Sequence, residues 1–282
     1  MVRQALALEE TVCPLCRSAD YRVAYRFDPY AVARCGVCGF YYLSPRLAEA
    51  AMLDIYRDDD YFEGTENGYT SYVEQEKALR ATFRRFLDNL RRRGLSGGSL
   101  LEVGCGYGYL LDEARRDFSP RVGTDFSAQA VAEARRVADR VYQGGLEQLP
   151  PDETYDCIVA INVIEHIYDP LPFVESLVAH LAPGGRVVIA TPHMGSFWRR
   201  LMGRRWASFK LPEHVLYFDG PALARLMQAA GLARVQPLPY PHAFPLALVA
   251  AKLNLTLMGP FGRANCWLPQ TMVAMYGFKR DG

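Results

Sequence analysis

One stretch restricts the fold of this chain more than any other. Residues 100–111 read LLEVGCGYGYLL, in which an apolar run leads into a turn with Gly104, Gly106 and Gly108 and then into a second apolar run. Glycine lets the backbone turn sharply and approach a ligand, and a helix that starts after such a turn offers free N–H groups. An acidic residue, Glu102, precedes the first glycine by two positions. The stretch therefore predicts a strand, a ligand-binding turn and a helix.

The alternation of strand and helix continues downstream. Further strands are predicted at 121–126, 155–162, 185–192 and 233–239, and helices at 109–118, 127–140, 170–181 and 220–231. Alternation of this kind predicts a parallel sheet with helices on both faces. Residues 271–280 are predicted as one more strand at an edge of the sheet. We therefore expect an α/β protein with a Rossmann-like, doubly wound sheet of seven strands.

The glycine pattern also separates two classes of cofactor. A dinucleotide-binding turn would read G-x-G-x-x-G/A, but Tyr109 stands where the third glycine or alanine should be. The second predicted strand reaches Asp125, and a carboxylate there is placed to accept both ribose hydroxyls of a nucleoside. The turn EVGCGYG resembles motif I of class I S-adenosylmethionine-dependent methyltransferases. Residues 144–167 and 181–192 are similar to the segments that carry this family's fourth and fifth strands.

The resemblance covers about residues 98–192 and implies roles for individual side chains. Asp125 would bind the ribose, the turn would approach the methionine part, and Asn162 would face the cofactor. Many relatives carry Asp where Gly145 stands, so a backbone group or Glu147 would hold the adenine amino group here. The expected cofactor-binding residues are Glu102, Gly104, Cys105, Gly106, Gly108, Asp125, Phe126, Gly145, Leu146, Asn162 and Tyr72.

Four cysteines form two C-x-x-C pairs near the start of the chain, at Cys13, Cys16, Cys35 and Cys38. In a reducing compartment this spacing favours a metal site over a disulfide framework. Four thiolates close the coordination sphere of a tetrahedral zinc ion, so we expect a structural zinc ribbon. The alternative is four unrelated buried thiols.

The ribbon together with KLPEHVLYF (210–218) resembles the zinc-containing C-methyltransferases that act on nucleotide sugars in antibiotic pathways. That resemblance implies that His214, next to Glu213, acts as a base and that His166 is a second functional histidine. Their Y-x-E-H motif has its tyrosine replaced by Leu211, and their C-terminal domain has no match in this sequence. Alternatively, His166 ties two loops together, Glu165 caps a turn or orients a neighbour, and the PEH sequence is a structural turn.

The expected organisation is a ribbon, a connecting region and a larger domain. Tyr61, Tyr69 and Tyr72 precede the expected covering helix, and in related enzymes tyrosines of this region touch the methionine end of the cofactor or the substrate. The divisions are a zinc ribbon at 1–45, a linker and covering helix at 46–97, and an S-adenosylmethionine-binding domain at 98–282 with a loop insertion at 192–218 and an apolar lid at 242–268.

Composition limits the partners. The formal net charge is +1, from 32 basic and 31 acidic residues, whereas nucleic-acid-binding proteins usually carry a clear basic excess. The first ten residues lack the apolar core of a secretory signal, and Lys252 and Asn254 interrupt the most apolar segment. We expect a cytoplasmic protein without a membrane span. Residues 195–209 mix tryptophan with arginine, which suits an anionic substrate, a membrane surface or a plain amphipathic helix.

The expected activity is histidine-assisted methyl transfer from S-adenosylmethionine to an oxygen or carbon of a small molecule, such as a natural product, a sugar or a lipid-linked intermediate. The protein would be a monomer or a homodimer. Two alternatives remain: an RNA or protein methyltransferase that uses the ribbon for recognition, and a cofactor-binding scaffold without catalysis.

Overall fold

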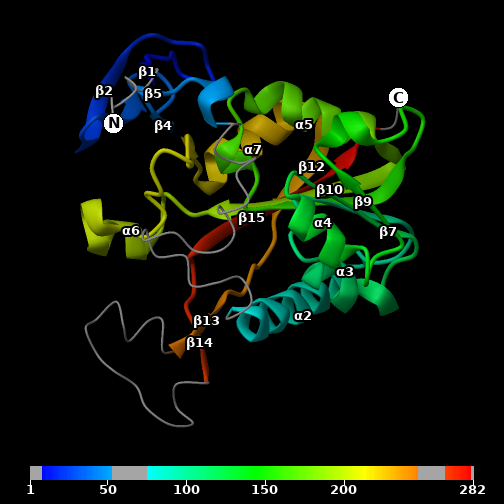
Figure 1. Cartoon of the computed structure of the whole chain (residues 1–282). Helices are drawn as coiled ribbons and strands as arrows, with labels where there is room; N and C mark the ends of the chain where they lie inside the picture. The colour runs from blue at the N-terminus through cyan, green and yellow to red at the C-terminus, as the bar shows by residue number, and fades with distance from the viewer. Residues whose placement is uncertain (1–7, 53–74, 247–263, 281–282) are drawn as a thin grey trace, which may run out of the picture.

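The computed structural model describes residues 8–52, 75–246 and 264–280 (Figure 1). Its centre is a seven-stranded sheet with the order β12-β15-β10-β9-β6-β7-β8. Neighbouring strands pair in parallel from β10 to β8, whereas β15 runs antiparallel to both β10 and β12. The strands are β6 (Leu100–Val103), β7 (Arg121–Asp125), β8 (Arg140–Gln143), β9 (Tyr155–Ile161), β10 (Leu181–Pro192), β12 (Leu232–Pro237) and β15 (Met272–Lys279).

The strands predicted from the alternating pattern are confirmed, but the placement of 271–280 at an edge is wrong. β15 lies between β10 and β12, and its first six residues are all buried. A strand inside a sheet with both faces covered must be apolar on both sides. β12 forms the edge instead. From Ala233 to Pro237 its residues are partly buried or exposed, as an edge strand allows.

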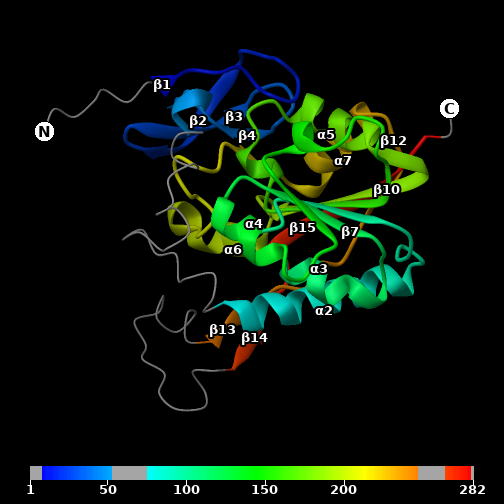
Figure 2. The ribbon, with the colours of Figure 1, turned by 45° about the vertical axis from the view of Figure 1, so that its right-hand side comes forward.

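Helices cover both faces of the sheet (Figure 2). Alternate residues of one strand face opposite cores: Leu101 packs in the core on the side of α5 and α7, and Leu100 packs in the core on the side of α2 and α3. The helices are α2 (Glu76–Arg92), α3 (Tyr109–Glu113), α4 (Ala128–Ala134), α5 (Pro170–Ala179) and α7 (Gly220–Ala229), with short 3-10 turns at η2 (Ala114–Arg116), η3 (Leu146–Gln148) and η4 (Ile164–His166). Among the described residues, no helix has the length and apolar content needed to cross a membrane.

A second sheet of four strands, ordered β11-β4-β3-β2, lies beside the large one. Three of its strands come from the N-terminal region: β2 (Tyr21–Phe27), β3 (Tyr30–Cys35) and β4 (Tyr41–Leu43). The fourth, β11 (Leu216–Tyr217), comes from the far end of the predicted 192–218 insertion and pairs with β4. The remaining elements are β1 (Leu8–Glu9), β5 (Arg46–Leu47), α6 (Phe197–Met202), η5 (Gly203–Arg205), β13 (Ala243–Pro245) and β14 (Asn265–Trp267).

Candidate active site

The glycine-rich turn joins β6 to α3 in a backbone conformation that side chains disfavour. Gly104 has φ +70°, and a Cβ atom there would lie 2.7 Å from Cγ2 of Val163. Gly108 has φ +75° and is the residue before the first turn of α3. Both positions combine a left-handed backbone with a close neighbour, so each requires glycine. The turn is thereby pressed against the segment that follows β9.

Asp125, the last residue of β7, holds this turn from the side. Its Oδ2 accepts a hydrogen bond from the amide of Gly106 at 2.8 Å, and its Oδ1 accepts one from the amide of Ser127 at 3.0 Å. Burial raises the pKa of Asp125, and these amide bonds oppose the rise. Each carboxylate oxygen retains a second lone pair. The side chain is 9% exposed, so a ribose hydroxyl fits as a further donor at this position.

Glu102 lies under the turn on β6 and is deeply buried. Its Oε2 has no hydrogen-bond partner among the described residues. Burial, with a contribution from the Asp125 charge, raises the pKa of Glu102 well above its ordinary range. A buried polar atom without a partner is costly, and a donor group of a ligand would remove that cost. The Cys105 thiol is buried and donates to the carbonyl of Gly106, so this residue can meet a ligand only through its backbone.

The residues expected near the adenine also fit a nucleoside. Phe126, directly after Asp125, is 57% exposed, which is unusual for a phenyl ring and suits stacking on a flat base. Leu146 is buried, and the amide of Gly145 donates to Oε1 of Glu147 at 2.8 Å. The Glu147 carboxylate therefore lies against the backbone of Gly145.

Asn162 follows β9 at the carboxyl edge of the sheet and has φ +55°. Its amide donates to the carbonyl of Ala190, and the residue is exposed. Left-handed backbone is uncommon outside glycine and is concentrated at binding sites. Tyr61, Tyr69, Tyr72 and residues 247–263 of the predicted lid lie outside the described residues.

Two histidines that are far apart in sequence meet at the same edge. The ring centroids of His166, in η4, and His214, in the loop before β11, are 4.7 Å apart with the rings edge to face. Nδ1 of His166 lies 3.2 Å from the carbonyl oxygen of Glu213, and Nδ1 of His214 lies 2.9 Å from that of Ser208. A carbonyl can only accept, so both rings carry their proton on Nδ1 when neutral. Nε2 of His214 is then the acceptor nitrogen.

Burial keeps both rings neutral and makes the neighbouring carboxyl a weaker acid. It lowers the pKa of His166 to about 4, and it lowers the pKa of His214 well below its ordinary range. The Lys210 charge acts in the same direction on both rings. Burial raises the pKa of Glu165 to about 7 and also raises that of Glu213.

Glu165 links the two segments that carry the histidines. Its carbonyl accepts a hydrogen bond from the amide of Val215 at 2.8 Å, and its Oε2 accepts one from the hydroxyl of Thr191 at 2.9 Å. Oε1 of Glu165 is buried without a partner among the described residues. Thr191 was missed in the sequence, although its position at the end of the predicted strand 185–192 was a usable signal.

The side chains of Glu165, His166 and His214 offer two kinds of chemistry. Their ligand atoms all lie within 4.8 Å of one another, a set that can hold a divalent cation. Without a cation, the neutral imidazole of His214 can accept a proton at Nε2, and the adjacent carboxylate can stabilise the resulting charge. Glu165 and His166 follow closely after Val163, whose side chain packs against Gly104 of the glycine turn.

The four N-terminal cysteines converge on one point. Sγ of Cys13 lies 3.5 Å from that of Cys38, and Sγ of Cys16 lies 3.5 Å from that of Cys35. All four sulfurs are within 4.8 Å of one another. Zinc–sulfur bonds of about 2.3 Å in a tetrahedron give sulfur–sulfur distances of about 3.8 Å. The donor set therefore fits one tetrahedral ion with no open position.

Comparisons with known proteins agree with this geometry. A family model described as "Methyltransferase domain" matches residues 72–236. A ubiquinone biosynthesis O-methyltransferase of Bradyrhizobium sp. (strain ORS 278) is 32% identical over 138 residues, which are 46% of this chain and 51% of that protein. A protein of Mycolicibacterium smegmatis named "Probable S-adenosylmethionine-dependent methyltransferase" is 33% identical over 164 residues, 56% of this chain and 60% of its own length. The chain thus spans little more than half of the curated relatives it matches.

Solved structures share the fold at low sequence identity. Magnesium protoporphyrin IX methyltransferase from Synechocystis PCC 6803, with bound S-adenosylhomocysteine, has a TM-score of 0.53 and 13% identity, and the match covers 83% of this chain and all of that one. An S-adenosylmethionine-dependent methyltransferase from Thermotoga maritima has a TM-score of 0.51 and 19% identity, covering 74% of this chain and 96% of its own. These likenesses establish the Rossmann-like α/β fold.

Proposed function

Since the chain belongs to the methyltransferase-domain family, we propose that it transfers the methyl group of S-adenosylmethionine to an oxygen atom of a small molecule. The observation that carries this proposal is the His166–His214 pair, which lies at the sheet edge where the glycine turn and Asp125 form a nucleoside cradle. The O-methyltransferase names of the curated relatives favour oxygen as the acceptor atom.

S-adenosylmethionine, when bound, supplies a methyl group already activated by its sulfonium charge. The work of the protein is therefore to align two partners and to exclude water. Asp125 accepts from the ribose hydroxyls, the glycine turn lets the backbone approach the cofactor closely, and Phe126 offers a stacking surface. His214 accepts the proton of the acceptor hydroxyl at Nε2, while its Nδ1–H stays fixed on the Ser208 carbonyl.

A second candidate is methylation of a sugar carbon. The four-cysteine ribbon and the PEH sequence at 212–214 favour it, because the sugar C-methyltransferases combine the same two features. Isotope-labelled methyl transfer separates the two products, since NMR distinguishes a methyl group on oxygen from one on carbon. Methylated RNA or protein as the sole product would contradict both candidates.

Asp125→Ala should weaken binding of both S-adenosylmethionine and S-adenosylhomocysteine by about 1.5–3 kcal/mol, the scale of a hydrogen bond to a charged group. Isothermal titration calorimetry of the full chain measures this change, and NAD should not bind. Asp139→Ala is the matched control, because the Asp139 carboxylate is exposed and pairs with Arg121 at the other end of β7, away from the turn. Unchanged affinity in Asp125→Ala would show that the ribose lies elsewhere.

The pH dependence of kcat/KM should reflect the buried histidines. A base acts when it has lost its proton, so a lowered pKa keeps the active form populated as the pH falls. The acid limb should therefore lie below 6.5, the ordinary histidine value. Steady-state rates between mildly acidic and neutral pH measure the limb. An acid limb at or above 6.5 that disappears in His214→Gln would contradict a buried neutral base.

A further inference from the structure

Helix α6 presents apolar side chains to solvent instead of burying them. None of its residues is buried, and Phe197, Leu201 and Met202 are 59%, 66% and 37% exposed. Three of the exposed large hydrophobic side chains lie within the six residues of α6. Among the described residues there are seven in all: Val12, Val23, Val37, Phe126, Phe197, Leu201 and Met202. A local cluster of this kind marks an interaction surface more strongly than scattered exposed residues do.

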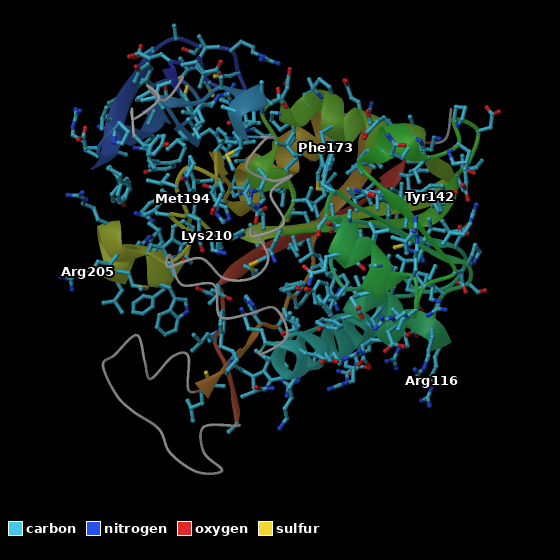
Figure 3. The ribbon with its side chains drawn as sticks, viewed as in Figure 1. Arg116, Tyr142, Phe173, Met194, Arg205 and Lys210 are labelled. Carbon is cyan, nitrogen blue, oxygen red and sulfur yellow. The ribbon has the colours of Figure 1, made fainter. Side chains whose placement is uncertain are left out.

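The segment around α6 carries basic residues and no acidic residue that would neutralise them. Residues 193–212 contain four arginines and one lysine and no acidic residue. Arg200, Arg204 and Arg205 are exposed, whereas Arg199 is used internally, donating to the Met194 carbonyl and to the Tyr25 hydroxyl. Figure 3 shows Arg205 at the outer edge of this region and Lys210 on its inner side, toward the sheet. Within 193–212, the exposed charges that α6 and η5 present are therefore all positive.

Contacts near both ends of the segment formed by α6 and η5 hold it in place. The Ser196 hydroxyl accepts from the amide of Arg199 at 3.1 Å, which caps the helix, and Trp198 Nε1 donates to the carbonyl of Pro269 at 2.7 Å. Trp206 is buried and packs on Phe209, with ring centroids 5.1 Å apart. The apolar side chains are thus displayed from a fixed support.

We propose that α6 and η5 form a docking surface for an anionic lipid membrane. Apolar side chains that enter the acyl boundary and arginines that meet lipid phosphates are the two components of an interfacial helix. Leu201 and Met202 favour a lipid surface over a nucleic acid, because aliphatic side chains make no favourable contact with phosphate. The 192–218 insertion carries α6 near its start and His214 near its end, so docking through α6 would bring the membrane to the segment that supplies the proposed base.

Flotation of the full chain with vesicles tests the proposal. The chain should bind vesicles of phosphatidylcholine containing about one third phosphatidylglycerol, bind pure phosphatidylcholine about tenfold less, and lose binding as salt rises. Phe197→Ser with Leu201→Ser should reduce binding to the anionic vesicles about tenfold. Arg200→Glu with Arg205→Glu should reduce it by a similar factor and remove most of the salt dependence.

Matched controls use exposed residues of the same type elsewhere. Val23→Ser with Val37→Ser removes two exposed apolar side chains from the ribbon, and Arg92→Glu with Arg93→Glu reverses two exposed charges at the end of α2. Both control variants should bind like the unchanged chain. Equal loss in a control pair, no vesicle binding, or binding to an RNA probe without vesicle binding would overturn the proposal. Vesicle binding requires no methyl transfer, so its failure leaves the proposed reaction untouched, and the reverse also holds.

Discussion

Replacing His214 by alanine should lower turnover by about 10²–10⁴-fold and leave the affinity for S-adenosylmethionine close to that of the unchanged protein. The reason is geometric. His214 is 5% exposed, its Nδ1 is fixed on the Ser208 carbonyl, and its ring centroid lies 4.7 Å from that of His166. Its proton-accepting nitrogen acts only when the acceptor loses a proton, so the loss falls on kcat. Single-turnover rates and calorimetry on the same preparation separate the two effects.

His166→Ala should raise the KM for the acceptor at least as much as it lowers kcat, because its ring packs against His214. His180→Ala is the matched control. His180 directly precedes β10, at the amino end of the sheet, opposite the edge that carries the pair. Thermal unfolding of each variant checks that the fold persists. A folded His214→Ala protein with normal turnover would remove the base assignment. Loss of turnover on adding EDTA, restored by a divalent cation, would assign Glu165, His166 and His214 as cation ligands instead.

The parts of the fold that depend on local sequence were predictable. Three glycines with left-handed backbone, the run of strand residues before them and Asp125 at the end of the next strand fixed the turn and its neighbours. The order of strands was not predictable to the same degree. The apolar run Met272–Tyr276 reads as a buried strand, but nothing in it says that it inserts between β10 and β12.

The contact between the two histidines illustrates a second limit. His166 and His214 were both singled out, but their approach depends on the carbonyls of Glu213 and Ser208 and on the amide of Val215. Every residue has a backbone carbonyl and nearly every residue a backbone amide, so the pattern of side chains does not predict which of these groups will form the bonds. For the same reason β11 was missed, because a two-residue strand is defined by its partner β4 and not by its own composition.

That pairing changes what the ribbon is expected to do. From the sequence, loss of a cysteine ligand should lower stability before it affects the chemistry. In the structure, β4 follows the second cysteine pair and hydrogen-bonds to the segment after His214: the amide of Leu43 donates to the carbonyl of Val215 at 2.8 Å, and Leu216 pairs with Tyr42. His214 is therefore supported on one side by η4 and on the other by the ribbon sheet.

Cys35→Ser should accordingly remove the bound metal, release β4 from β11 and lower turnover at least about tenfold, because a misplaced base loses much of its contribution. Structural zinc in small ribbons supplies about 10–16 kcal/mol of apparent folding free energy, so three remaining thiolates should not preserve the ribbon. Elemental analysis of the unchanged chain should give about one zinc per chain, the number that one closed tetrahedral site holds.

Hydrogen exchange provides the readout that activity alone lacks. In Cys35→Ser, the amide of Leu43, which donates to the Val215 carbonyl, should exchange faster, while those of β6 and β9 keep their protection and S-adenosylmethionine still binds. Cys266→Ser is the control, because that thiol donates to the Phe244 carbonyl in β13 and lies outside the four-sulfur cluster. A metal-free Cys35→Ser protein that keeps slow exchange at Leu43 and normal turnover would show that the ribbon folds, and positions His214, without an ion.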